Sequence, residues 1–117
     1  MTNVYDEKLA LCGSSPLTGY LRTGFCQLDP SDEGTHTVCA IMTPEFLHYT
    51  FTQGNDLITK HNSFPGLKPG NKWCVCALRW LQAYKAGVAP PVIGASTNSK
   101  TLRIIPYRIL RPFLVDI

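Results

Sequence analysis

The sequence predicts a compact α+β protein, in which a small sheet packs on one main helix over residues 72–86. Three observations support this class. Residues 72–86 have the apolar spacing of an amphipathic helix, residues 35–42 are rich in β-branched and apolar side chains, and glycines and prolines interrupt the chain at short intervals. With 117 residues, 44% of them hydrophobic, the chain is expected to form a single domain over 1–117.

The main helix is expected between Asn71, a good N-cap, and Gly87, a common stop. A helix there would point Cys74 and Cys76 about 160° apart, so that one metal ion could not bind both. Cys74 would lie in the first turn, where the helix dipole and Lys72 favour a thiolate. Cys74 is therefore a candidate reactive thiol, with inert packing as the alternative.

A shorter helix is expected over residues 43–52. Thr43 can cap it, Pro44 suits its first position, and Gly54 ends it. Long loops rich in glycine and proline follow, and the loop at 64–70 is stiff enough to form the wall of a pocket. The remaining elements are expected to be short: a turn at 14–19, a strand within 19–28, a strand within 88–96 and a helix over 98–103.

Charge is unevenly distributed along the chain. Residues 1–57 carry two basic and seven acidic side chains, a net charge of −5, whereas residues 58–117 carry nine basic and one acidic side chain, a net charge of +8. The two halves can neutralise each other on folding, or the basic half can bind an acidic partner. No nucleic-acid motif or run of basic residues is present, so nucleic acid is not an expected partner.

Neither a signal peptide nor a stretch of about 20 apolar residues is present, so we expect no membrane insertion and an intracellular, cytoplasmic protein. The number of cysteines is odd, which favours reduced thiols over a disulfide framework. These cysteines are Cys12, Cys26, Cys39, Cys74 and Cys76.

Chemically active residues gather in two places. Asp32, His36 and Cys39 lie close in sequence, although on a regular strand His36 and Cys39 would face opposite sides. The candidate catalytic residues are Cys74, Cys39, His36 and Asp56. The candidate zinc ligands are Cys26, His36, Cys39, Cys74 and Cys76, the last two only if residues 72–76 are not helical.

Polar side chains also suggest a ligand site. Asn55 and Asp56 follow the shorter helix and can either rigidify a turn or contact a ligand. Arg22 and Arg79 can bind an anion through the guanidinium fork, with salt bridges to the acidic half as the alternative. His48 and His61 are isolated. The predicted ligand-binding residues are Arg22, Asp32, His36, Asn55, Asp56 and Arg79.

Several segments together resemble the family called domain of unknown function 2237, from about Cys12 to the C-terminus. These segments are PLTGYLRTGFC (16–26), DEGTHTVCA (32–40), TPEFLHYTFTQGNDL (43–57), FPGLKPGNKWCVCALRW (64–80) and AGVAPPV (86–92). The resemblance implies no activity, because the family has none assigned. The chain departs from the family pattern at Asn98, where the family tends to have histidine, and this weakens an enzyme reading.

Three hypotheses follow. The first is an uncharacterised binding module that has a polar Cys/His/Asp pocket and needs no cofactor. The second is a structural zinc protein. The third is a thiol-dependent enzyme or redox protein with Cys74 or Cys39 as the nucleophile.

Overall fold

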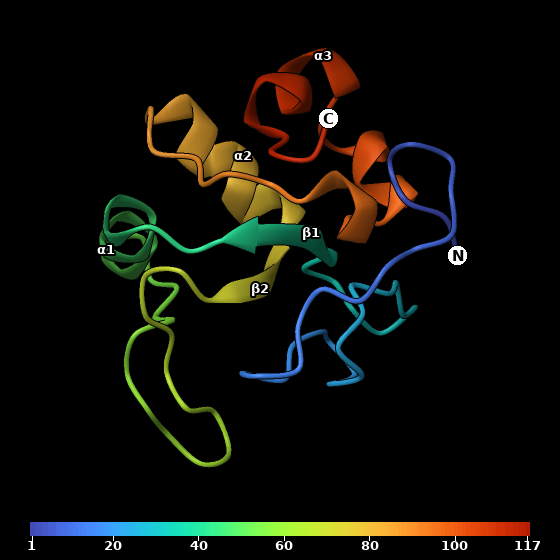
Figure 1. Ribbon diagram of the computed structural model, residues 1–117. Coiled ribbons are helices and arrows are strands. Elements are labelled where there is room, and N and C mark those ends of the chain that lie inside the picture. Colours follow the sequence, from blue (N-terminus) through green and yellow to red (C-terminus); the bar gives the residue numbers. More distant parts are fainter.

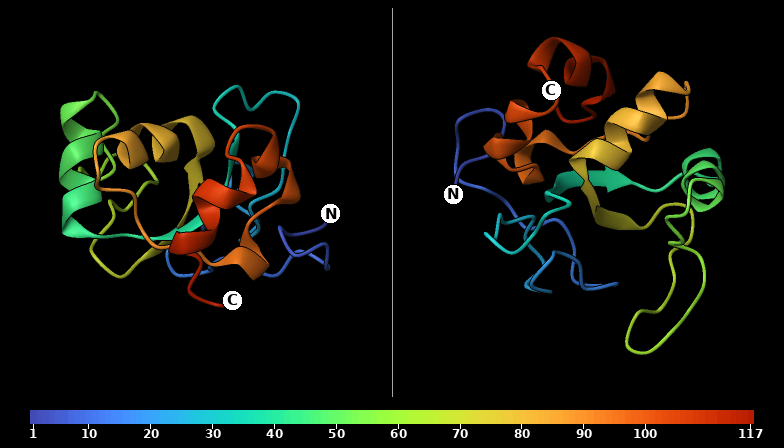
Figure 2. Two further views of the ribbon diagram at one scale, coloured as in Figure 1. Left: turned by 90° about the horizontal axis from the view of Figure 1, so that it is seen from above. Right: turned by 180° about the vertical axis from the view of Figure 1, so that it is seen from behind.

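A two-stranded antiparallel sheet lies at the centre of the fold (Figure 1). β1 (His36–Ile41) pairs with β2 (Lys72–Cys76), and the computed structural model describes all residues, 1–117. Helix α2 (Ala77–Lys85) and the C-terminal segments lie above the sheet in Figure 1, while the loops that follow the first residues of the chain lie below it, as the right-hand view of Figure 2 also shows. The first residues lie beside the C-terminal segments, where Asn3 pairs with Asn98. Three helices and this sheet in one globule confirm the predicted α+β class.

The side chains of the two strands alternate between two separate cores. Val38, Ala40 and Val75 belong to the main hydrophobic core of 16 residues. Cys39 and Cys74, which are direct partners across the two strands, belong to a second cluster with Cys12 and Cys26. This follows from the two-residue period of a strand, which sends neighbouring side chains to opposite faces.

The predicted helix over 72–86 is wrong at its start. Residues 72–76 are strand β2, and α2 begins only at Ala77 with Cys76 as its N-cap. Asn71 does not cap this helix, because its side chain accepts a hydrogen bond from the Lys68 backbone N–H instead. The apolar face of α2 is buried at Ala77, Trp80 and Ala83, and Trp80 is completely enclosed, whereas Tyr84 is exposed.

The shorter helix is confirmed as α1 (Pro44–Thr52). The hydroxyl of Thr43 accepts a hydrogen bond from the Phe46 N–H at 3.1 Å, which is the expected capping interaction. Gly54 follows with a φ of 89°, a conformation that favours glycine.

Other short elements differ from expectation. No strand forms over 19–28 or 88–96, and the segment at 98–103 is a 3-10 helix capped by Asn98. The last α-helix is the single-turn α3 (Tyr107–Leu110). The 3-10 helices span Gly94–Ser96, Ser99–Arg103 and Arg111–Phe113. None of the helices is long and apolar enough to cross a membrane.

Two disulfides attach residues 9–35, the N-terminal arm, to the sheet. Cys12 is bonded to Cys39 in β1, and Cys26 is bonded to Cys74 in β2. The expectation of reduced thiols is therefore wrong for four of the five cysteines, and only Cys76 is free. Because the arm contains no helix or strand of its own, these covalent bonds fix where it lies.

Loss of one disulfide should destabilise the protein strongly. The Cys12–Cys39 bond closes a loop with a sequence separation of 27, and chain-entropy arguments assign roughly 3–4 kcal/mol to a loop of this length. We expect the double variant Cys12→Ser/Cys39→Ser to lose that much unfolding free energy in urea denaturation. The control is Cys76→Ser, which removes only the free thiol. Equal losses in the two variants would contradict the prediction.

The C-terminus is held by a carboxylate that accepts three hydrogen bonds. Asp116 accepts from the backbone N–H groups of Gly94 and Ala95, and from the hydroxyl of Tyr5 at 2.7 Å. Burial acts to raise the pKa of Asp116, but the hydrogen bonds from Ala95, Tyr5 and Gly94 outweigh burial and hold the pKa below its usual value.

The stabilisation of the fold by the ionised Asp116 carboxylate should be lost in acid. A depressed folded-state pKa stabilises the protein above the unfolded value, 3.8, and the stabilisation disappears as the pH falls through the folded value. We expect Asp116→Asn to lower the melting temperature at neutral pH, and the difference from the wild type to shrink below the unfolded value. A difference that is constant across pH would show that charge is not involved.

Candidate functional site

A pocket of about 340 Å³ lies where the N-terminal arm meets the sheet and the long loop after α1. It brings together residues from four separate segments of the chain. Four of these residues, Arg22, His36, Asp56 and Cys74, were singled out from the sequence. The lining residues are Gly19, Tyr20, Arg22, His36, Asp56, Leu57, His61, Phe64, Trp73 and Cys74.

Arg22 is held in place by its own segment and by an aromatic ring. Its Nη1 donates a hydrogen bond to the Gly19 carbonyl at 2.6 Å, and its Cζ lies 5.0 Å from the centre of the Trp73 ring. This is a cation–π contact. Arg22 forms no ion pair, so most of its guanidinium donors remain available to a ligand.

His36 is oriented by a buried carboxylate. The Asp32 side chain is fully buried, and its Oδ1 lies 2.7 Å from Nδ1 of His36. The other oxygen, Oδ2, accepts the backbone N–H of His36 at 2.8 Å. A carboxylate only accepts hydrogen bonds, so Nδ1 carries the hydrogen and Nε2 is the nitrogen left for a ligand.

Two neighbouring residues pack against the His36 ring, although its side chain remains 38% exposed. A Cβ added to Gly34 would lie 2.7 Å from Cε1 of His36, so only glycine permits this approach. The Tyr20 ring stacks on the His36 ring at a centroid distance of 5.9 Å. His36 is therefore held by packing as well as by Asp32, and its imidazole is preorganised.

Asp56 is exposed but conformationally fixed. Its Oδ1 accepts the backbone N–H groups of Ile58 and Thr59, both at 2.9 Å, so the predicted rigid turn is present. Hydrogen bonding from the Thr59 side chain and these N–H groups holds the pKa of Asp56 below its usual value. Asp56 thus contributes a negative charge to the pocket while it shapes the loop.

Aromatic rings form the apolar wall of the pocket. Phe64 contacts the Trp73 ring edge-on at 5.5 Å, and His61 contacts Phe64 at 5.7 Å. The loop at 64–70 contributes Phe64 to the lining, in line with its expected role. Nothing near His61 in the sequence pointed to a role in binding, because it is an isolated histidine on an exposed loop.

Three predicted ligand-binding residues are not part of the pocket lining: Asp32, which bonds the His36 ring, Asn55 and Arg79. Asn55 donates its side-chain N–H to the Thr50 hydroxyl at 3.0 Å and fixes the end of α1. Arg79 donates to the Gln53 carbonyl at 3.0 Å and forms no salt bridge. The predicted role in binding is not supported by their positions, and the acidic and basic halves of the chain make no ion pair with each other.

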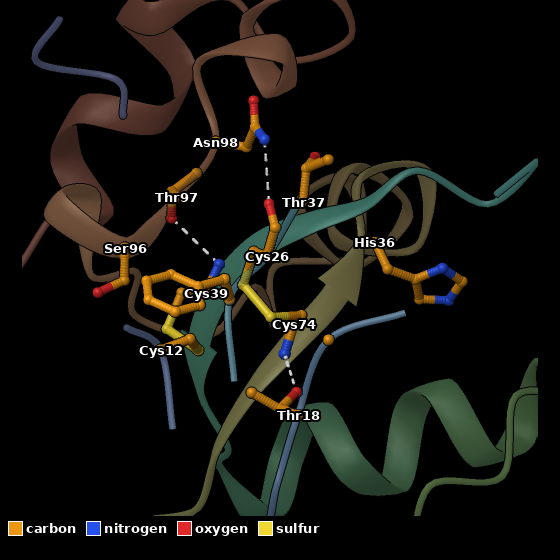
Figure 3. Close-up of a disulfide and its surroundings, with 12 residues drawn as sticks. Cys12, Thr18, Cys26, His36, Thr37, Cys39, Cys74, Ser96, Thr97 and Asn98 are labelled. Carbon is orange, nitrogen blue, oxygen red and sulfur yellow. Dashed lines mark hydrogen bonds between the residues drawn. A yellow bond between two sulfur atoms is a disulfide. The ribbon is translucent and has the colours of Figure 1, made fainter. Parts of the chain in front are cut away.

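The four disulfide-bonded cysteines form a buried cluster (Figure 3), and one of them, Cys74, lines the pocket. The sulfur atoms of Cys12, Cys26 and Cys39 lie within 4.8 Å of one another, close enough to hold a metal, and Cys74 is bonded to Cys26. Neither Cys74 nor Cys39 is a free thiol, so the structure does not support either as a nucleophile.

The metal ligands expected from the sequence are only partly brought together. Cys12 joins this group, whereas His36 and Cys76 do not. The His36 ring points away from the sulfurs in Figure 3, as its bond to Asp32 requires. The bonded cysteines are far apart in the chain, so their local spacing does not predict the cluster. Only the number of cysteines in the sequence pointed to it.

The comparisons with known proteins give a family but no activity. No curated protein matches the chain. A family model described as "Uncharacterized protein conserved in bacteria (DUF2237)" matches residues 2–114, almost the whole chain, and confirms the resemblance seen in the sequence. The chain therefore belongs to this family of uncharacterised proteins.

Proposed function

We propose that the protein is a binding module for a small organic ligand, which it takes up in the pocket beside Arg22, His36 and Asp56. The observation that carries this proposal is the convergence of these three polar side chains from distant segments onto one pocket. Each is fixed by contacts of its own before any ligand arrives. Preorganised polar groups lower the entropic cost of binding.

The pocket has the composition typical of a small-molecule site. Its volume of about 340 Å³ falls at the lower end of the range for such sites, and half of its lining residues are hydrophobic. Trp73 and Phe64 offer aromatic surface from two rings set at 68° to each other, and Nε2 of His36 is the ring nitrogen that Asp32 does not bond. A ligand of fragment size with an aromatic or planar part fits this description.

Binding should be visible at one of the two tryptophans. Trp73 lines the pocket, whereas Trp80 is enclosed in the core and donates its indole N–H to Pro90. We expect a screen of small aromatic compounds to yield ligands that shift the indole NMR signal of Trp73 and leave that of Trp80 unchanged.

Two phenylalanine variants test the location. Phe64→Ala should weaken the binding of such a ligand, because it removes part of the apolar wall. Phe51→Ala is the matched control, since Phe51 is exposed on α1 and outside the pocket. Equal affinities in the two variants, or a screen in which no compound shifts Trp73, would refute the proposal.

A second candidate function is zinc binding by the reduced protein, and the sulfur cluster specifically favours it. In a reducing compartment, such as the expected cytoplasm, the disulfides would open and leave four buried thiols close together. Thiolates in this number suit a tetrahedral zinc site. In an oxidising compartment the disulfides would persist instead. The cytoplasmic location and an acidic partner stay predictions.

Cobalt is a suitable probe for this second candidate. After reduction, we expect one Co²⁺ per chain, with the visible absorption of tetrahedral thiolate coordination. Cys39→Ser should lose that absorption, and Cys76→Ser should keep it, because Cys76 lies outside the cluster. Absorption that is absent after reduction, or that depends equally on both cysteines, would rule the metal site out.

A further inference from the structure

The pocket holds one fixed positive charge and one fixed negative charge. Among its ten lining residues, Arg22 is the only lysine or arginine and Asp56 is the only carboxylate. No salt bridge joins Arg22 to Asp56, since the one contact between an acidic side chain and a basic or histidine side chain in the protein is that of Asp32 with His36. Each charge is therefore available to an oppositely charged group of a ligand.

Both charges are held by their own segments of the chain. Arg22 has a φ of 55°, donates to Gly19 and lies over the Trp73 ring, so its guanidinium is positioned from two sides. Asp56 is fixed by two backbone N–H groups, which donate to Oδ1, and by the Thr59 side chain. A carboxylate has about four acceptor sites, so the exposed Asp56 can still accept a hydrogen bond from a ligand. The low pKa of Asp56 keeps this carboxylate charged at neutral pH.

We propose that the ligand is a small zwitterion of the amino-acid type, with a carboxylate at Arg22, a protonated amine at Asp56 and an apolar or aromatic part against Phe64 and Trp73. A simple anion would be attracted by Arg22 but repelled by the negative charge of Asp56. A simple cation would be attracted by Asp56 but repelled by the positive charge of Arg22. A zwitterion satisfies both charges at once. This inference rests on the proposed pocket function and narrows the class of ligand.

Three matched probes share one aromatic ring and differ only in charge. Para-(aminomethyl)benzoate carries both charges, para-methylbenzoate carries only the carboxylate, and para-methylbenzylamine carries only the ammonium. Phenylalanine, with phenylpropionate and phenethylamine as its singly charged partners, repeats the comparison with the charges closer together. Affinities are measured by NMR titration of the Trp73 indole signal.

We expect at least one zwitterion to bind about tenfold or more tightly than both of its singly charged partners, as a further charge-assisted hydrogen bond would provide. Arg22→Gln should remove this advantage over the ammonium probe. Asp56→Asn keeps a side-chain oxygen that can accept the N–H groups of the turn, but it removes the negative charge. This variant should remove the advantage of the zwitterion over the carboxylate probe. Arg79→Gln and Asp6→Asn are matched controls outside the pocket and should change neither.

The outcomes separate this inference from the function on which it rests. If neutral or singly charged compounds shift Trp73 as strongly as the zwitterions do, the pocket binds ligands but the inference is wrong. If a zwitterion binds better but Arg22→Gln and Asp56→Asn leave its advantage intact, the charge assignment is also wrong. If no compound shifts Trp73, both proposals fail.

Discussion

The attachment of the N-terminal arm to the sheet by two disulfides is the constraint on which the site depends. A two-stranded sheet is marginally stable alone and needs cover on its faces. α2 and the C-terminal segments cover one face, but the arm that covers the other has no regular structure. Covalent bonds from Cys12 and Cys26 replace the hydrogen-bond ladder that a further strand would have supplied.

This arrangement also explains where the pocket lies. Arg22 belongs to the part of the arm between the two attached cysteines, so its position relative to β2 is set at both ends. Cys74 itself lines the pocket, next to Trp73 on the same strand. The disulfide-bonded cysteines and the polar pocket residues thus lie at the same contact between arm and sheet. A change in the disulfides would therefore also move the residues that line the pocket.

Local signals in the sequence were sufficient for some elements and misleading for others. α1 could be predicted because Thr43 and Pro44 act within its first turn. The start of the main helix could not, because residues 72–76 pair with β1, more than thirty residues earlier, and the Cys74 N–H donates to the Thr18 hydroxyl. The apolar residues of this segment do have helical spacing, but hydrogen bonding to the distant strand β1 decides its conformation.

The same division holds for the site. Arg22, His36 and Asp56 stood out as polar residues in loop-rich segments, and all three line the pocket. Asn55 and Arg79 stood out equally and serve the local structure instead. His61 and the role of Gly34 were out of reach, because each depends on which ring lies next to it in space.

The register of the sheet has a consequence for how the chain reaches its oxidised state. Cys39 and Cys74 face each other across the strands, yet neither is bonded to the other. Four cysteines can pair in three ways, and the cross-strand pair is the nearest at hand once the sheet forms. Oxidation before the arm docks would join that pair and leave Cys12 and Cys26 without partners on the sheet. Correct pairing therefore requires that docking precede oxidation, or that a thiol–disulfide exchange repair the early bond.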